Sequence, residues 1–348
     1  MTAIRRDVLK LVAAGAAALP WARASAAKAA ANVPKSRDSK MMGAAKFVDV
    51  GGIRTRYFDG GMGEPMVLIH GGQWPATSSA DGWAPVFDQL AEHFHIYVFD
   101  KLGHGFTDNP KTDADFSMDA IIRHAYGFIQ AVGITRCVLG GHSRGGLPAA
   151  RIAADHPELV SHLVLFDSNT LAPDDPNTPE RIDPEANGPP PTREQIRAAA
   201  MATRQSFKKD FYTDAYIEAE YRIAQQPKLR EVAQRFNQAR DAWVRANPEL
   251  VKQHPLWTRN MGATTWWMYK AKYETIDEIK AGALKAPTII IWGFNDPTAP
   301  YFLGVNMMEL ISKVVPQSEL HIINQSGHFV YAEHPEEVTR LIVGFVKG

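Results

Sequence analysis

The feature that most constrains the fold of this chain is a repeated alternation of short apolar runs with segments of helical spacing. Continuous apolar runs of this length, separated by helices, are typical of strands buried on both faces of a mainly parallel sheet. The alternation therefore predicts an α/β fold with helices on both sides of the sheet. The expected strands occupy residues 66–70, 95–100, 136–141, 159–167, 288–293 and 320–324.

An antiparallel hairpin is expected before these strands. Residues 46–50 and 53–59 are strand-like, and Gly51 and Gly52 between them suit a tight turn. The hairpin would lie at one edge of the sheet. Helical spacing predicts helices over 83–94, 117–132, 144–156 and 335–345, the second of them capped by Ser117.

One long stretch interrupts the alternation. Residues 172–285 contain no convincing strand, and they open with a segment rich in Pro, Asp and Asn that predicts an irregular linker. A helical insertion between two strands predicts a cap over the edge of the sheet, with the core formed by residues 46–171 and 286–348. Its helices are expected over 192–209, 213–225, 228–245 and 264–273.

The N-terminus has the layout of a bacterial export signal. Arg5 and Arg6 precede the mostly apolar residues 8–19, and small residues near Ala26 offer cleavage options. The paired arginines resemble the twin-arginine type of signal. We therefore expect a signal peptide over residues 1–26, a loose leader over 27–45, and a mature protein released into the periplasm without stable membrane insertion.

Composition narrows the range of partners. Lys and Arg total 38, as do Asp and Glu, so the formal net charge is zero and no basic surface for nucleic acid is indicated. Cys137 is the single cysteine, which excludes an intrachain disulfide, and its apolar run predicts a buried, inert thiol. No metal-ligand spacing and no nucleotide-binding glycine pattern is apparent. We expect a small-molecule substrate and no metal or other cofactor; the oligomeric state is not predicted.

The segment GGHSRGG, residues 140–146, lies between a predicted strand and a predicted helix. It contains the pattern G-x-S-x-G, in which a serine occupies a strained strand-to-helix turn with its hydroxyl exposed. The glycines on either side would prevent clashes at that corner. Ser143 is therefore the predicted nucleophile.

A serine nucleophile needs a base, and the base needs an orienting acid. In this topology the acid and then the histidine follow the serine along the chain. His328, in a glycine-preceded loop before the last helix, is the predicted base. Asp296, after the strand 288–293, is the predicted acid. Asp167, at the end of another strand, is an alternative acid.

The reaction also needs donors for the developing oxyanion. The backbone N–H of Arg144, directly after the nucleophile, is one predicted donor. The loop after strand 66–70 supplies the other, assigned to Gly72 with Gln73 as the neighbouring alternative. His70 in the same loop is expected to be structural.

Five motifs in this order resemble those of the α/β-hydrolase superfamily, of the type with a helical cap. They are VLIHGG, VFDKLGHG, GGHSRGG, WGFNDP and SGHFVYAEHPEEV, and they cover most of residues 47–167 and 286–348. The resemblance implies a mostly parallel α/β-hydrolase sheet flanked by helices, with an inserted all-helical cap. Epoxide hydrolases and haloalkane dehalogenases of this superfamily carry an aspartate at the position of Ser143.

One branch of the superfamily is partly similar. Meta-cleavage-product hydrolases, which cut C–C bonds in vinylogous diketone acids, share the HGG loop, the capped core and an aromatic residue after the loop histidine. They have Asn and Trp where this chain has His142 and Phe329. Their loop has a Gly-Pro-Gly form, whereas this chain has HGGQWPATSSADGW.

The substrate pocket is expected to be apolar. Aromatic residues gather in the cap and near the predicted mouth, where they would either line a pocket or form the core of the cap. The side chain of Arg144 would meet a substrate carboxylate or pair with an acidic neighbour. The candidate pocket residues are Gln73, Trp74, His142, Trp266, Trp267 and Phe329.

These residues predict a serine hydrolase. The main prediction is cleavage of a carboxylic ester or lactone of an apolar or aromatic small molecule through an acyl-enzyme. The alternative is a C–C bond hydrolase acting on a diketone or ring-fission acid. A third hypothesis, a non-catalytic binding protein on the same scaffold, would be expected to lack a triad residue.

Overall fold

The computed structural model describes residues 39–178, 189–249 and 268–348, which all belong to the unit Lys35–Gly348. The predicted export signal over residues 1–26 lies outside the described residues. The candidate pocket residues Trp266 and Trp267 also lie outside them.

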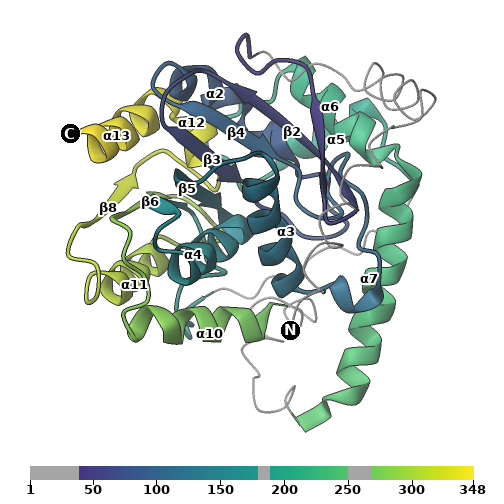
Figure 1. The fold of residues 1–348 in the computed structure, drawn as a ribbon. Helices are drawn as coiled ribbons and strands as arrows, with labels where there is room; N and C mark the ends of the chain where they lie inside the picture. Colours follow the sequence, from purple (N-terminus) through teal and green to yellow (C-terminus); the bar gives the residue numbers. More distant parts are fainter. Residues whose placement is uncertain (1–38, 179–188, 250–267) are drawn as a thin grey trace, which may run out of the picture. The chain divides into compact units, whose positions relative to one another are not determined.

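A single eight-stranded sheet forms the centre of the described chain (Figure 1). The strand order is β1-β2-β4-β3-β5-β6-β7-β8. β2 runs antiparallel to β1 and β4, and every pairing from β4 to β8 is parallel. The predicted fold class is confirmed, with the Gly51–Gly52 hairpin at the edge. The strands are β1 (Lys46–Val50), β2 (Ile53–Gly60), β3 (Pro65–Ile69), β4 (His95–Phe99), β5 (Cys137–His142), β6 (Val160–Phe166), β7 (Thr288–Gly293) and β8 (Ser318–Ile323).

Helices cover both faces of this sheet (Figure 1). Alternate residues of each strand point to opposite faces, so Val67 and Ile69 join one buried cluster and Met66 and Leu68 join the other. The first cluster includes α3 (Met118–Ala131), α4 (Gly146–Asp155), α10 (Tyr269–Lys280) and α11 (Phe302–Ile311). The second includes α2 (Ala84–Ala91), α12 (Val330–Glu333) and α13 (Pro335–Lys347).

Between β6 and β7 the described residues form helices and no strand, as the insertion pattern predicts. These helices are α5 (Arg193–Ala202), α6 (Asp214–Ala224), α7 (Pro227–Ala246) and α10. α10 contacts α4 and α11, so it belongs to the helical layer on the sheet. α5 ends at Ala202, although helical spacing predicts a helix to residue 209. Residues 203–213 instead form an irregular connector to α6, which we call the cap connector.

The start of the described chain is held against α2. The Asp88 carboxylate accepts hydrogen bonds from the backbone N–H of Lys40, at 2.8 Å, and of Met41, at 3.0 Å. Met42 is 2% exposed and packs into the second cluster. These last residues of the expected leader are therefore docked on the core, because Asp88 supplies acceptors for backbone groups that no strand or helix satisfies.

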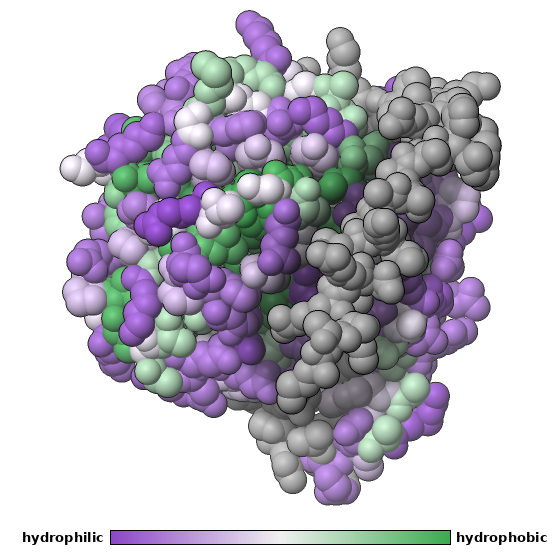
Figure 2. Space-filling view, viewed as in Figure 1, coloured by the Kyte–Doolittle hydropathy of each residue, from purple (hydrophilic) through white to green (hydrophobic). Residues whose placement is uncertain are grey.

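The face shown in Figure 2 is largely hydrophilic, with hydrophobic residues gathered in patches between polar side chains. Among residues 39–178, 189–249 and 268–348, we find no helix that is both long and apolar enough to cross a lipid bilayer.

Candidate active site

Ser143 lies at the corner between β5 and α4 in the left-handed region of backbone space, with φ at 51°. That conformation is strained for a residue with a side chain and is stabilised here by its surroundings. A Cβ on Gly141 would stand 2.2 Å from the carbonyl oxygen of Gly145, and a Cβ on Gly145 would stand 2.2 Å from that of Ile69. The glycines are thus required for the close backbone approach at this corner.

The Ser143 hydroxyl is hydrogen-bonded to a histidine that is itself bound to a carboxylate. Ser143 Oγ lies 3.0 Å from Nε2 of His328, and Nδ1 of His328 lies 2.6 Å from Oδ2 of Asp296. Because a carboxylate only accepts, Nδ1 carries the proton and Nε2 is free to accept the proton of Ser143. The structure therefore brings together the three residues predicted to act as nucleophile, base and acid, in the geometry that activates a serine.

Asp296 is fixed through its other oxygen. Oδ1 accepts hydrogen bonds from the backbone N–H of Thr298 at 2.7 Å, from its hydroxyl at 2.8 Å, and from the N–H of Ala299 at 3.0 Å. Three donors on one oxygen hold the carboxyl group in place and leave Oδ2 directed at His328.

Asp167, the alternative acid, has a different environment. Its Oδ1 accepts a hydrogen bond from the N–H of Gly293 at 2.8 Å, and the side chain is completely buried. Burial and the neighbouring charge of Asp296 raise the pKa of Asp167 well above its usual value. Of the two acids, Asp296 holds the imidazole, and the environment of Asp167 favours the protonated form of its side chain.

His142 is hydrogen-bonded to the loop that carries His328. Its Nε2–H donates to the backbone carbonyl oxygen of His328 at 2.7 Å, and the two imidazole rings lie 4.8 Å apart. Burial and the proximity of His328 lower the pKa of His142 well below its usual value. His142 is therefore a neutral donor at the wall of the site.

The loop predicted to supply an oxyanion donor is held by two buried side chains. Nδ1–H of His70 donates to the Gly71 carbonyl at 2.8 Å, and Nε2 accepts from the N–H of Lys101 at 3.0 Å. Nζ of Lys101 donates to the Gly72 carbonyl at 2.9 Å. A Cβ on Gly71 would stand 3.0 Å from Cβ of Ser143, so the loop lies directly against the nucleophile.

His70 thus has the structural place expected of it, and Gly72 has a left-handed φ of 75°. The assignment of Gly72 and Arg144 as oxyanion donors stays a prediction. Arg144 follows Ser143, and its side chain is 6% exposed. Burial and the nearby charge of Arg144 hold the pKa of Lys101 well below its usual value.

The cap connector is bound to the loop of His328. The N–H of His328 donates to the carbonyl of Gln205 at 2.6 Å. The buried carboxylate of Glu333 accepts from the N–H groups of Phe207 at 2.8 Å, Lys208 at 2.9 Å and Gly327 at 3.0 Å. One side chain therefore joins the connector to the residue that precedes the base.

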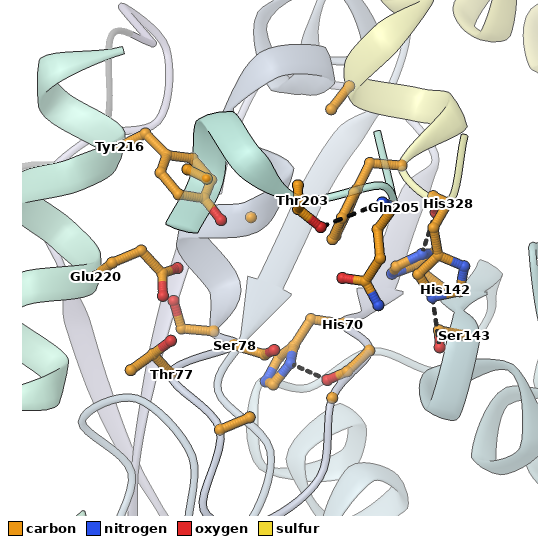
Figure 3. A pocket seen from close by; sticks show the side chains of 18 of the residues that line it. His70, Thr77, Ser78, His142, Ser143, Thr203, Gln205, Tyr216, Glu220 and His328 are labelled. Carbon is orange, nitrogen blue, oxygen red and sulfur yellow. Dashed lines mark hydrogen bonds between the residues drawn. The ribbon is translucent and has the colours of Figure 1, made fainter. Parts of the chain in front are cut away.

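A cavity of about 600 Å³ opens onto Ser143 and His328 (Figure 3). Four of the six predicted pocket residues line it, namely Gln73, Trp74, His142 and Phe329. Trp74 lies deeper than the expected mouth position: it is 1% exposed, and its Nε1–H donates to the Leu102 carbonyl at 2.9 Å.

Other lining residues were not singled out from the sequence, and many are polar. They include Thr77, Ser78, Gln195, Gln205, Tyr212, Tyr216 and Glu220. Most come from the cap. The sequence gives no signal for them, because a polar helix face has the same composition whether it faces solvent or a cavity. Across the residues that the structure describes, no group of three or more His, Cys, Asp or Glu side chains is arranged to hold a metal ion.

The sequence profile described as "alpha/beta hydrolase fold" matches residues 64–335 of the chain. This range is most of the chain and contains the nucleophile corner, the acid and the histidine. The chain belongs to the α/β-hydrolase family of enzymes.

Within that family, curated relatives are similar over most of their length. The chain is 28% identical over 308 residues to the 2-hydroxy-6-oxo-6-(2'-aminophenyl)hexa-2,4-dienoic acid hydrolase of Metapseudomonas resinovorans, covering 86% of this chain and 90% of that protein. It is 27% identical over 296 residues to the 2-hydroxymuconate semialdehyde hydrolase of Pseudomonas sp. strain CF600, covering 85% and 91%. A solved structure of a serine hydrolase involved in carbazole degradation, the CarC enzyme, superposes with a TM-score of 0.62 at 26% identity, covering 87% and 98%.

These similarities correct the predicted substrate. The main prediction, cleavage of a carboxylic ester or lactone, is wrong, because the relatives are named as hydrolases of dienoic acids and semialdehydes. They match the alternative prediction of a ring-fission acid. The nucleophile motif did not distinguish the two, since a serine that attacks a carbonyl serves both reactions.

Proposed function

We propose that this enzyme hydrolyses a C–C bond in a 2-hydroxy-6-oxo-2,4-dienoic acid, a vinylogous diketone acid of the type produced by ring fission. The observation that carries the proposal is the Ser143–His328–Asp296 arrangement at a cavity, in a chain similar over most of its length to hydrolases of such acids. The substrate class is taken from the names of the relatives. The catalytic steps are argued from the residues of this chain.

The first step is attack on the ketone at C6. Ser143 Oγ forms a bond to that carbon while His328 Nε2 takes its proton, and Asp296 stabilises the resulting imidazolium. The carbonyl oxygen becomes an oxyanion, for which the N–H groups of Gly72 and Arg144 are the proposed donors. Preorganised donors of this kind supply much of the rate enhancement in acyl transfer.

The second step breaks the bond between C5 and C6. Cleavage requires the 2-keto tautomer of the substrate, in which the proton of the C2 hydroxyl has moved to C5. The electron pair of the C5–C6 bond then passes through the C3–C4 double bond onto the C2 oxygen. That oxygen takes the proton held by His328, which gives a 2-hydroxy-2,4-dienoic acid, and the C6 acyl group stays on Ser143. Water, deprotonated by His328, then attacks the acyl carbon and releases a carboxylic acid and free Ser143.

The experiment that tests the proposal is a spectrophotometric assay with 2-hydroxy-6-oxo-6-phenylhexa-2,4-dienoate, whose conjugated dienolate chromophore is lost on cleavage. Wild type is expected to turn it over with a higher kcat/KM than it shows for p-nitrophenyl acetate. Ser143→Ala is expected to lose at least about 10⁴-fold in kcat. A folded wild-type enzyme that cleaves the ester and leaves the dienoate intact would overturn the proposal.

A further inference from the structure

The loop after β3 carries the proposed oxyanion donor on its most adjustable residue. Gly72 lines the cavity, and its φ of 75° lies in the left-handed region. A glycine adopts positive and negative φ with little difference in energy, so nothing in Gly72 itself holds its N–H in one direction. That direction therefore depends on what binds the two peptide groups on either side of Gly72.

A buried histidine holds the first of these peptide groups. Nδ1–H of His70 donates to the Gly71 carbonyl across 2.8 Å (Figure 3). The peptide bond between Gly71 and Gly72 is trans, so the N–H of Gly72 points away from the carbonyl that His70 binds.

A buried lysine holds the second peptide group. Nζ of Lys101 donates to the Gly72 carbonyl across 2.9 Å, and the side chain is completely buried. Among residues 39–178, 189–249 and 268–348, this is the only hydrogen bond of the Lys101 amine, and no carboxylate forms an ion pair with it. Burial of an amine without an opposite charge is unfavourable. An apolar side chain of similar length would fill the space without that cost, so the amine adds one thing here, its contact with Gly72.

The lysine is itself attached to the core at the end of β4. Its backbone N–H donates to Nε2 of His70 at 3.0 Å, so the two side chains that hold Gly72 are joined. Asp100 directly precedes Lys101, and the Asp100 carboxylate pairs with the buried Arg56 at 2.6 Å. Lys101 thus connects a fixed strand end to the adjustable glycine.

We propose that Lys101 is a positioning residue for the oxyanion donor: its amine holds the Gly72 carbonyl and thereby keeps the Gly72 N–H directed at the oxyanion that forms at Ser143. The inference rests on the proposed function, in which Gly72 supplies that N–H. Lys101 is fully buried and does not line the cavity, so it acts through the backbone of the loop. Loss of its amine weakens binding of the tetrahedral intermediate more than binding of the substrate, because the donor acts on charge that develops during the reaction.

The experiment compares a ligand that forms an oxyanion with one that does not. The carbonyl carbon of 2,2,2-trifluoroacetophenone bonds to Ser143 Oγ while His328 takes the serine proton, which gives a hemiketal oxyanion. Acetophenone binds without this addition. Lys101→Met keeps the length of the side chain and removes the amine. We expect it to raise the inhibition constant of trifluoroacetophenone at least about tenfold and that of acetophenone less than about threefold.

Steady-state kinetics with the 6-phenyl dienoate give a second readout. In Lys101→Met, kcat should fall about ten- to a hundredfold, with KM changed less than about threefold. Lys111→Met is the matched control, because the Lys111 amine also donates to a glycine carbonyl, that of Gly51 at 3.1 Å, but at an exposed position. This variant should keep the wild-type values. A folded Lys101→Met enzyme that keeps both inhibition constants, or loses affinity for both ketones equally, would overturn the inference.

A crystal structure of the wild-type hemiketal tests the same inference if Lys101→Met does not fold. The hemiketal oxygen is expected within about 3.2 Å of the Gly72 nitrogen, with Lys101 still bound to the Gly72 carbonyl. A Gly72 N–H directed away from that oxygen would overturn the role of Lys101. A wild-type enzyme that forms this hemiketal and leaves the dienoate intact would overturn the proposed function and leave the role of Lys101 standing.

Discussion

His142 donates a hydrogen bond to the backbone carbonyl of His328 across 2.7 Å, so the residue before the nucleophile fixes the loop that carries the base. We expect His142→Ala to lower kcat about ten- to a hundredfold, because small displacements of a catalytic group are costly, with a smaller change in KM. His321→Ala, at a half-buried position of the edge strand β8, is the control. Steady-state kinetics decide: equal kcat in both variants would show that the contact does not position His328.

The two buried acids near the base are expected to respond differently to the same change. Asp296→Asn should lower kcat about 10³-fold or more, because the imidazole loses the carboxylate that orients and stabilises it. Asp167→Asn resembles the protonated acid in shape and charge, and kcat should stay within about threefold of wild type. A large loss of kcat in Asp167→Asn would mean that the second carboxyl takes part in the reaction.

The raised pKa of Asp167 also predicts that the free energy of unfolding depends on pH. Its pKa is raised in the folded state, by burial first and then by Asp296, so folding takes up a proton above the ordinary pKa of an aspartic acid. The free energy of unfolding of wild type, measured against Asp167→Asn, should therefore fall as pH rises through that window. The expected slope is about 1.4 kcal/mol per pH unit until the folded-state pKa is reached. Urea unfolding at several pH values measures it; parallel curves for the two proteins would contradict the assignment.

Glu333 is expected to contribute both to the free energy of unfolding and to kcat. Glu333→Gln replaces an acceptor of backbone N–H groups by an amide whose N–H₂ cannot accept, and the free energy of unfolding should fall by about 2–3 kcal/mol. Because Gly327 N–H is one of the donors, kcat should fall as well. Glu309→Gln, exposed on α11, is the control for loss of one charge. If chemical denaturation and kcat show no difference between these variants, the hydrogen bonds of Glu333 contribute to neither stability nor turnover.

The reactivity of Cys137 tests whether the core around β5 is closed to solvent. Burial raises the pKa of its thiol to about 12, and it is fully buried on β5. A thiol reagent at pH 8 should therefore leave the native enzyme unmodified, since the thiolate is the reactive form. In guanidinium chloride one thiol per chain should react, because the chain has one cysteine. Rapid labelling of the native enzyme would show that β5 is accessible.

Some of the site could be predicted from the sequence because its signals are local. The corner at Ser143 needs glycines at 141 and 145, and their close contacts explain why that pattern identifies the turn. The order of acid and histidine after the nucleophile follows from the strand order. Asp296 and His328 each directly follow a strand in that order, so their meeting could be expected before any side chain was placed.

Other parts depend on docking and carry no local signal. Residues 203–209 retain a helical composition, yet the chain leaves the helix there because Gln205, Phe207 and Lys208 use their backbone groups to bind the core. α11 was not predicted, because its sequence FLGVNMMELI is apolar on most sides and has no clear helical period. Glu220 resembles any acid on a cap helix until α6 is placed over the cavity.

The attachment of Gln205, Phe207 and Lys208 to the loop of His328 and to Glu333 has a consequence for building chimaeras. An exchange of the segment between β6 and β7 for that of a relative would replace the cap helices that line the cavity. It would also replace Gln205, whose carbonyl accepts the backbone hydrogen bond of His328. Splice points placed after residue 209 would keep that partner with the recipient core. Helices α6 and α7 could then be exchanged as a specificity module.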